Sequence, residues 1–405
     1  VAAGSRGRRA GLPSTPMIAR WLVVVSAAAG CGRIGYDPAA VDAAADSAEA
    51  GPPLGTLMAC DQPVQLIDLG DTGGATATTF ALDVAATTTG FVAAWQTGGG
   101  QTHTSGLAFA EDASGPYLAN IQSDALAATK EGPIAIAAVG DQVLLAVDDA
   151  ANVGVQFLPL DAAGYERAGA TRIDGYRAFG FDYLAGDPGR GRFVAMLGTG
   201  ADSHAVALDV DGNLVDGPDP MFTAMPEALA LRPLAGGYAA ITGNPSNCDV
   251  VVADGALAAN VATRQAIPMT CHNASLVVAP GGAAVVAGWN CDDNRVWATG
   301  GPPGTMLPMH HEVFGDDADN ISSNPRLGVT SAGVWYAFEV GADRYGRALL
   351  GPDSQPLPAL TPGVVVTAAG RKAHDVATHG DVPFLFWLQV DGTTTSLWAM
   401  RMCVP

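Results

Sequence analysis

Two acidic segments of the chain carry the side chains best suited to binding a cation. They comprise Asp292, Asp293, Asp316, Asp317, Asp319 and Asn320. Carboxylate and amide oxygens at short spacing are the ligands that calcium prefers. The spacing differs from that of an EF-hand loop, however, and the terminal glutamate of such a loop is missing. We therefore expect solvated acidic loops, with a calcium or ligand site as the alternative.

Signatures of nucleophilic, phosphate-binding and zinc-dependent catalysis are missing from the sequence. It contains no G-x-S-x-G nucleophile elbow, no P-loop and no H-E-x-x-H motif. Cys248, Cys271 and Cys291, together with His272, could suggest zinc, but no C-x-x-C pair occurs among them. We therefore expect no catalytic residue, and no cofactor other than the calcium considered above.

The elements that position all these residues follow an internal repeat. A glycine opens each of seven apolar runs, and successive glycines lie 45 to 51 residues apart. A period of this size is typical of the blades of a propeller, each built from four short strands. The glycines are Gly90, Gly140, Gly191, Gly237, Gly282, Gly333 and Gly380.

Further strand-like stretches flank each apolar run. The stretches that precede the runs cover residues 80–86, 133–139, 179–185, 228–234 and 274–279. A third stretch, and usually a fourth, follows each run, and no segment between them has a sustained helical period. The sequence thus predicts an all-β fold, a β-propeller of about seven four-stranded blades.

The two ends of the repeat region predict how the ring closes. The seventh unit stops after its third strand, at Met402, whereas an additional strand over residues 63–69 precedes the first unit. An N-terminal strand that completes the last blade would remove the open edges that invite aggregation. Cys60 and Cys403 flank these two strands. We therefore predict a disulfide between Cys60 and Cys403.

A second disulfide is expected within the fifth unit. Cys271 and Cys291 lie ten residues on either side of Gly281, in a predicted hairpin whose facing positions can come close. This pairing leaves Cys248 with a free thiol. A bridge from Cys248 to Cys271, which would leave Cys291 unpaired, is the alternative, because sequence alone does not fix connectivity.

The N-terminal region has the pattern of an export signal. Arg20 precedes an apolar run from Trp21 to Ala29, which is too short to span a bilayer as a helix. Residues 1–30 are therefore interpreted as a misassigned start followed by a signal peptide. The segment that follows is rich in Ala, Asp and Pro and cannot bury a core, so residues 31–57 are predicted to be a disordered tether. The propeller is expected over residues 58–405.

The end of the signal segment resembles the lipobox of bacterial lipoproteins. Small residues at Ala28, Ala29 and Gly30 stand directly before Cys31. The resemblance implies diacylation of Cys31, followed by cleavage and anchoring in the outer membrane, since Gly32 and not an aspartate comes next. More than one acyl chain gives stable membrane attachment. An ordinary signal peptide cut near Ala29 is the alternative.

The charge of the chain limits its partners. The formal net charge is -20, which repels the phosphate backbone of nucleic acids. We expect a monomeric, non-enzymatic module of the cell envelope that binds a peptide, glycan or protein. The alternatives are a polysaccharide hydrolase or lyase, with acidic residues converging at the propeller channel, and a structural envelope protein. A channel lined by Ala, Val and Thr would favour binding, whereas three or more acids meeting at its mouth would favour the enzyme.

Overall fold

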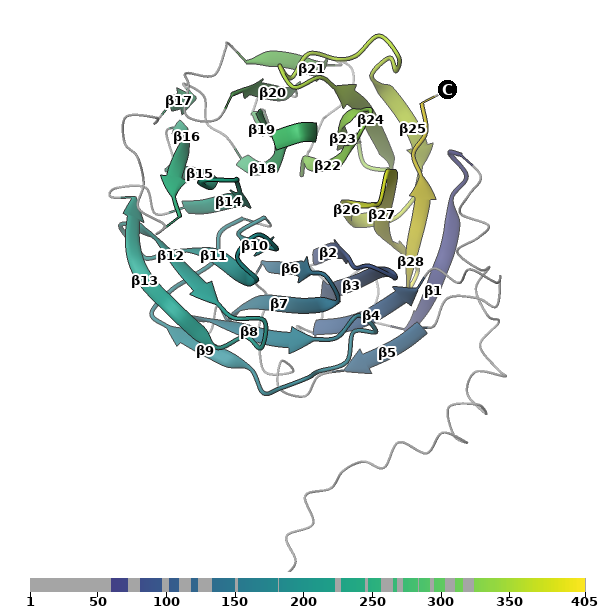
Figure 1. Ribbon diagram of the computed structural model, residues 1–405. Coiled ribbons are helices and arrows are strands. Elements are labelled where there is room, and N and C mark those ends of the chain that lie inside the picture. The colour runs from purple at the N-terminus through teal and green to yellow at the C-terminus, as the bar shows by residue number, and fades with distance from the viewer. Residues whose placement is uncertain are drawn as a thin grey trace, which may run out of the picture. The chain divides into compact units, whose positions relative to one another are not determined.

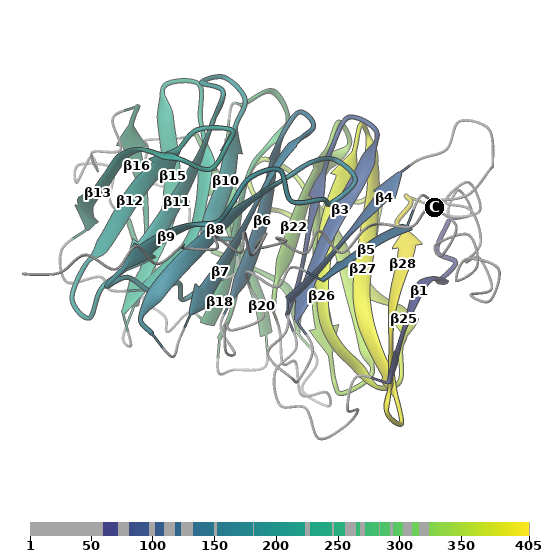
Figure 2. The ribbon, with the colours of Figure 1, turned by 90° about the horizontal axis from the view of Figure 1, so that it is seen from below.

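The computed structural model contains seven antiparallel four-stranded sheets arranged around a central axis (Figure 1). It describes residues 60–71, 81–96, 102–108, 118–122, 133–149, 152–180, 182–222, 227–244, 247–255, 265–267, 272–282, 284–291, 295–302, 310–315 and 324–404. Seen from the side, the sheets stand next to one another as twisted blades (Figure 2). In these residues the secondary structure is strand, apart from the short 3-10 turn η5 (Pro280–Gly282). This part of the chain is a seven-bladed β-propeller.

Six blades consist of four strands that are consecutive in sequence and run from the axis outwards. Blades one and two contain β2 (Ala81–Ala86), β3 (Gly90–Gln96), β4 (Thr102–Ala108), β5 (Leu118–Gln122), β6 (Ile134–Val139), β7 (Gln142–Asp149), β8 (Gly154–Leu160) and β9 (Thr171–Asp174). Blades three and four contain β10 (Leu184–Asp187), β11 (Arg192–Gly198), β12 (Ser203–Leu208), β13 (Leu214–Phe222), β14 (Glu227–Pro233), β15 (Gly237–Asn244), β16 (Asn247–Asp254) and β17 (Gln265–Ile267). Blades five and six contain β18 (His272–Val278), β19 (Val285–Cys291), β20 (Arg295–Gly301), β21 (His311–Gly315), β22 (Arg326–Thr330), β23 (Gly333–Val340), β24 (Arg344–Leu350) and β25 (Gly363–Thr367).

The seventh blade joins the two ends of the propeller. It contains β26 (Arg371–His379), β27 (Val382–Asp391) and β28 (Thr394–Arg401), and its outermost strand is β1 (Val64–Asp71). β1 pairs antiparallel with β28, as the sequence predicted. Cys60 and Cys403 form a disulfide with a Cα–Cα distance of 5.5 Å. Next to it, Asp61 forms an ion pair with Arg347 of blade six.

The core lies between neighbouring blades and is formed mainly by the second strand of each. Trp95, Trp289 and Trp387, at the ends of such strands, are each at most 1% exposed, and each belongs to a hydrophobic cluster shared by two neighbouring blades. At the closure of the ring, Phe91 of blade one meets Phe384 and Phe386 of blade seven edge-on, with ring centroids 5.4 Å and 5.1 Å away. Aromatic burial of this kind stabilises the contact between first and last blade.

One predicted strand is shorter in the structure than in the sequence analysis. The stretch over residues 179–185 forms a strand only from Leu184, and Phe179 is exposed. The cause is a close approach of backbones. A Cβ at Gly180 would lie 2.2 Å from the carbonyl oxygen of Leu229 in blade four, so the chain enters blade three against its neighbour before it pairs with its own sheet. This path brings Asp182 to the inside of the ring.

Candidate functional site

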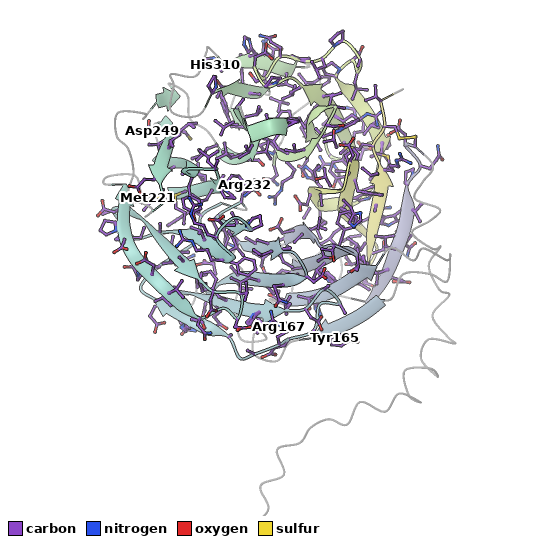
Figure 3. The ribbon with its side chains drawn as sticks, viewed as in Figure 1. Tyr165, Arg167, Met221, Arg232, Asp249 and His310 are labelled. Carbon is purple, nitrogen blue, oxygen red and sulfur yellow. A yellow bond between two sulfur atoms is a disulfide. The ribbon has the colours of Figure 1, made fainter. Side chains whose placement is uncertain are left out.

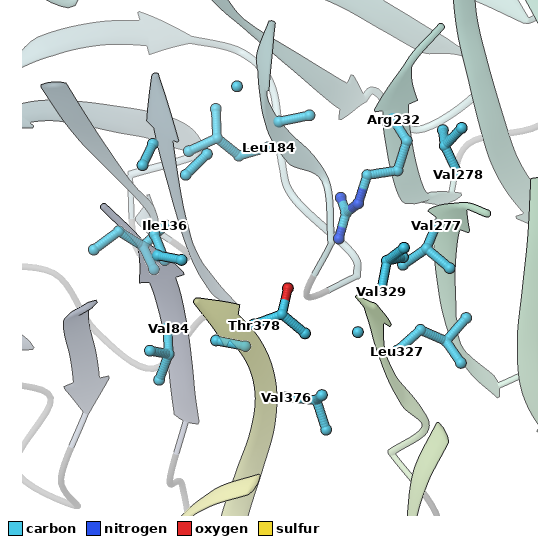
Figure 4. Close-up of a pocket in the computed structure, with 18 of the residues that line it drawn as sticks. Val84, Ile136, Leu184, Arg232, Val277, Val278, Leu327, Val329, Val376 and Thr378 are labelled. Carbon is cyan, nitrogen blue, oxygen red and sulfur yellow. The ribbon is translucent and has the colours of Figure 1, made fainter. Parts of the chain in front are cut away.

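The inner strands of the seven blades surround a channel that holds a cavity of about 390 Å³ (Figure 4). All seven inner strands contribute to its wall, mainly through their C-terminal halves. The side chains that form the wall are small or branched and apolar, because each inner strand packs on its neighbours and a large side chain would not fit at their convergence. A Cβ at Gly186, for example, would lie 2.1 Å from the carbonyl oxygen of Ala138. Typical members of the wall are Val84, Ala137, Val277, Val329 and Val376.

Arg232 is the exception among the described residues of this wall, because it is the one with a charged side chain. Its guanidinium reaches from β14 into the cavity, and the hydroxyl of Thr378 in β26 faces it from the other side (Figure 4). Figure 3 shows Arg232 on the inner side of the ring, whereas Tyr165 and Arg167 lie at its outer rim. The side chains that line the cavity are therefore apolar, apart from one cationic group and one hydroxyl group.

Arg232 is held in place through one edge of its guanidinium. Its Nη1 donates to the carbonyl oxygens of Leu231, at 2.8 Å, and Asp182, at 3.3 Å. Its Nη2 lies 3.1 Å from Oδ1 of Asp182. The Nε–H has no acceptor among the described residues. The side chain as a whole is 24% exposed and lines the cavity, so Arg232 is accessible from the channel.

Five charged side chains, in the wall of the cavity or beside it, form what we call the ionic belt. They are Asp83, Asp182, Arg232, Arg326 and Asp375. Arg326 of blade six is 4% exposed and lies 3.3 Å from Asp182 and 3.7 Å from Asp375. The belt thereby links blades one, three, four, six and seven across the axis.

Asp182 is the most connected acid of the belt. It contacts Arg232 and Arg326, and its Oδ2 accepts a hydrogen bond from the hydroxyl of Ser275 in blade five. Burial would raise the pKa of Asp182, but the two guanidinium groups and the Ser275 hydroxyl hold this pKa below its ordinary value. Asp182 is therefore ionised at neutral pH.

Asp83 and Asp375 form a carboxyl pair joined by a hydrogen bond. Each also accepts a backbone N–H from the next blade: Ile136 donates to Asp83 at 2.6 Å, and Val84 donates to Asp375 at 2.7 Å. Burial, followed by the neighbouring charge of Asp375, raises the pKa of Asp83 well above its ordinary value. Three carboxyl groups face two guanidinium groups in the belt, so one proton retained on Asp83 makes it neutral.

The proton on Asp83 predicts an unusual dependence of stability on pH. Above the ordinary pKa of an aspartate and below the raised pKa, the folded protein holds a proton that the unfolded chain releases. The free energy of unfolding therefore falls as pH rises, by about 1.4 kcal/mol per pH unit from this group. Asp83→Asn replaces the protonated acid with a neutral group, so we expect its stability relative to wild type to improve with rising pH.

Urea unfolding at several pH values from 5 to 9 checks this prediction. Asp391→Asn, at an exposed position at the end of β27, is the matched control and should follow the wild-type pH profile. If Asp83→Asn and wild type kept a constant difference over this range, Asp83 would not hold the extra proton.

A second buried ionic cluster joins blades six and seven away from the cavity. Glu339 of β23 lies 2.9 Å from Arg371 and 3.2 Å from Nδ1 of His374, both in β26. Burial opposes ionisation of Glu339, but His374 and Arg371 outweigh it and lower its pKa. This cluster contributes to the contact between the blades, and none of its residues is among those that line the cavity.

The acidic segments singled out from the sequence fall outside the described residues. This applies to Asp292, Asp293, Asp316, Asp317, Asp319 and Asn320, so their role as a calcium or ligand site stays a prediction. In the part of the chain that the structure describes, no group of three or more His, Cys, Asp or Glu side chains is suited to holding a metal ion. Within the same residues, no helix has the length and apolar character needed to cross a membrane.

The remaining cysteines differ in part from expectation. Cys248 is disulfide-bonded, which corrects the expectation of a free thiol at this position. Cys60 and Cys403 bond each other, so neither of them is the partner of Cys248. The predicted pairing of Cys271 with Cys291 involves side chains that lie outside the described residues, as does the lipidation of Cys31.

Neither the ionic belt nor Arg232 was predicted from the sequence. A signal was present, because Asp83, Arg232, Arg326 and Asp375 are charged residues next to the apolar residues of the inner strands of four different repeats. A charged residue next to the channel-lining part of a strand is costly unless it finds a partner. Charged residues on the inner strands of several repeats therefore point to partners across the axis.

Comparisons with known proteins agree on the fold. No protein-family model matches the chain, and no curated protein matches it either. Among solved structures, Kuenenia stuttgartiensis hydrazine synthase is similar with a TM-score of 0.54 and 13% identity, over 80% of this chain and 96% of that chain. The WD40 domain of Toxoplasma gondii coronin is similar with a TM-score of 0.53 and 12% identity, over 85% of this chain and 86% of that chain. The Cps50 (Swd1) β-propeller domain of Myceliophteria thermophila has a TM-score of 0.50 and 12% identity, over 78% of this chain and 95% of that chain. At these identities the likeness concerns the propeller fold alone.

Proposed function

We propose that the protein is an exported, lipid-anchored binding module of the bacterial cell envelope, whose ligand enters the central channel of the propeller. The observation that carries the binding role is the cavity itself. The side chains of its wall are mainly apolar, and one guanidinium and one hydroxyl group stand among them, which is the composition of a recognition pocket. The propeller fold is consistent with an interaction module, although a fold does not identify a ligand.

The acids that converge near the channel argue against the alternative of a polysaccharide hydrolase or lyase. Asp83, Asp182 and Asp375 do come together, but each is only 5 to 6% exposed. Their oxygens accept hydrogen bonds from the backbone, from Ser275 or from arginines. A glycosidase needs one carboxyl group to donate a proton to the substrate and another to attack or activate water. Acids committed to bonds within the protein are poorly placed for either task.

The proposed location at the cell envelope rests on the N-terminal sequence. A lipid on Cys31 and a tether over residues 31–57 would hold the propeller near the membrane surface while leaving its channel accessible to solvent. The net charge of -20 favours this arrangement, because it keeps the body of the protein away from anionic lipid headgroups.

The intact mass of the mature protein tests the anchor. We expect a chain that begins at Cys31 and carries acyl groups, and a Cys31→Ala variant that leaves the detergent phase for the aqueous phase on Triton X-114 partitioning. A mature protein with an unmodified thiol at Cys31, or one cut elsewhere, would overturn the lipid anchor.

Binding to an array of glycans and peptides tests the recognition role. We expect ligands to bind wild type and to be lost in Ala138→Leu, which places a larger side chain in the cavity wall, but retained in the exposed control Asp391→Asn. Release of reducing sugars from a polysaccharide by the purified protein would overturn the non-enzymatic role.

A further inference from the structure

We infer that the channel cavity recognises a carboxylate that carries a short aliphatic group, held by the Nε edge of Arg232 and the hydroxyl of Thr378. This inference rests on the proposed binding function and deepens it by naming the chemistry of the ligand. The carboxylate could belong to a free acid or to the C-terminal residue of a peptide, because both present the same group to the pocket.

The orientation of Arg232 supports an anionic ligand. Two backbone carbonyls accept hydrogen bonds from Nη1, and the carboxylate of Asp182 lies against Nη2, so the plane of the guanidinium is fixed. The Nε–H has no acceptor among the described residues, and the side chain as a whole is 24% exposed. A guanidinium donates two parallel hydrogen bonds to a carboxylate more effectively than to a neutral group. Because Asp182 already positions the guanidinium, little side-chain entropy is lost when the ligand binds.

The side chains in the wall of the cavity determine which group is attached to the carboxylate of the ligand. The isopropyl groups of Val84, Val277, Val329 and Val376 line the same cavity as the guanidinium. Each of these strands places its apolar side chains against the channel, so an aliphatic group there would replace water and gain burial. A volume of about 390 Å³ is at the lower end of the range for ligand sites and suits a small molecule or a chain end.

Because the whole protein is strongly negative, an anionic ligand needs a local positive charge, which the guanidinium of Arg232 supplies. With a net charge of -20, the surface repels anions, and a cationic ligand would be attracted almost anywhere on it. A cation in the cavity, however, would face the guanidinium of Arg232. The pocket thus selects against the ligands that the overall field attracts, which is a source of specificity.

Calorimetric titration with two pairs of probes tests the inference. The first pair is isovalerate and its neutral amide, isovaleramide, and the second is the tripeptide Gly-Gly-Val with a free or an amidated C-terminus. We expect the carboxylate of at least one pair to bind wild type and its amide to bind at least about tenfold more weakly, since a charge-assisted pair is lost. Binding of isovalerate would identify a free acid as sufficient, whereas binding of Gly-Gly-Val alone would identify a chain end.

Three variants separate recognition from folding. Arg232→Gln should weaken carboxylate binding at least about tenfold, and Arg232→Lys should recover part of it, because the charge returns without the planar fork. Both changes also touch Asp182, so Ala138→Leu serves as a second test that leaves the belt intact and should abolish binding by filling the cavity. Circular dichroism confirms that each variant is folded.

Equal affinity for acid and amide, or an affinity unchanged in Arg232→Gln, would overturn the carboxylate inference. So would the failure of both carboxylates to bind wild type. The proposed function has a separate test: a neutral glycan or peptide that binds wild type but not Ala138→Leu would leave the binding role standing while the carboxylate inference fails.

Discussion

Replacing both Cys60 and Cys403 by alanine is expected to lower the free energy of unfolding by about 2 to 5 kcal/mol. The two residues are 343 positions apart in the chain, so their bond restricts nearly the whole unfolded propeller. It also fastens the pairing of β1 with β28, on which the closure of the ring depends. Without it, the last blade can open at its outer edge before the rest of the molecule unfolds. Urea unfolding followed by tryptophan fluorescence measures the difference.

The double variant is preferable to chemical reduction, because reduction would also break the disulfide of Cys248. Asp61→Asn, which removes the neighbouring ion pair with Arg347 and keeps the disulfide, is the matched control and should cost much less. Equal unfolding midpoints for wild type and the double alanine variant would show that the strand pairing alone closes the ring.

Asp182→Asn is expected to lower the free energy of unfolding by about 3 to 5 kcal/mol. The substitution removes the charge that Arg232 and Arg326 share, and Arg326 is almost completely buried. Arg326 then loses one carboxylate partner and keeps Asp375, so more of the cost of its desolvation is left uncompensated. Thermal or urea unfolding at pH 7 measures the loss.

Two further variants separate the belt from ordinary surface ion pairs. Asp211→Asn removes an ion pair with Arg167 in which both side chains are partly exposed, and should cost less than about 1 kcal/mol. The double substitution Asp182→Asn and Arg326→Met removes both buried charges and should recover part of the loss. A loss from Asp182→Asn no larger than that from Asp211→Asn would show that the belt does not stabilise the fold.

Stability should also respond to acid through Asp182, in the opposite sense to Asp83. Because its pKa is held below the ordinary value, the folded protein binds fewer protons here than the unfolded chain as the pH falls. The contribution of Asp182 is thus present at neutral pH and is lost as the pH falls through its lowered pKa. Within one belt, Asp182 therefore lowers the free energy of unfolding as the pH falls, and Asp83 lowers it as the pH rises.

The blade architecture could be predicted from the sequence because its signal is local and repeated. Glycines such as Gly90, Gly237 and Gly333 begin second strands in the structure, and the strand before the first repeat pairs with β28. Turn residues and apolar alternation act over a few positions, so their repetition along the chain is visible without coordinates. The pairing of Cys60 with Cys403 followed from the same count of strands.

The entry into blade three could not be predicted in this way. The apolar residues around Phe179 suggested a strand, but the contact of Gly180 with the backbone of Leu229 displaces this segment from its own sheet. That contact joins residues of two blades, so it could not be predicted from the local sequence around Phe179. Tertiary packing outweighs strand propensity at this position.

By itself, the sequence determined the strands, the number of blades and the closure of the ring, since hydrophobic period and turn chemistry are properties of neighbouring residues. Only the tertiary structure decided that Asp83, Asp182, Arg326 and Asp375 meet in one belt and that Arg232 enters the cavity. The side chains that touch across the axis come from positions up to 292 residues apart in the chain, between Asp83 and Asp375. Their convergence depends on how seven sheets pack around the axis, and so does the chemistry of the channel.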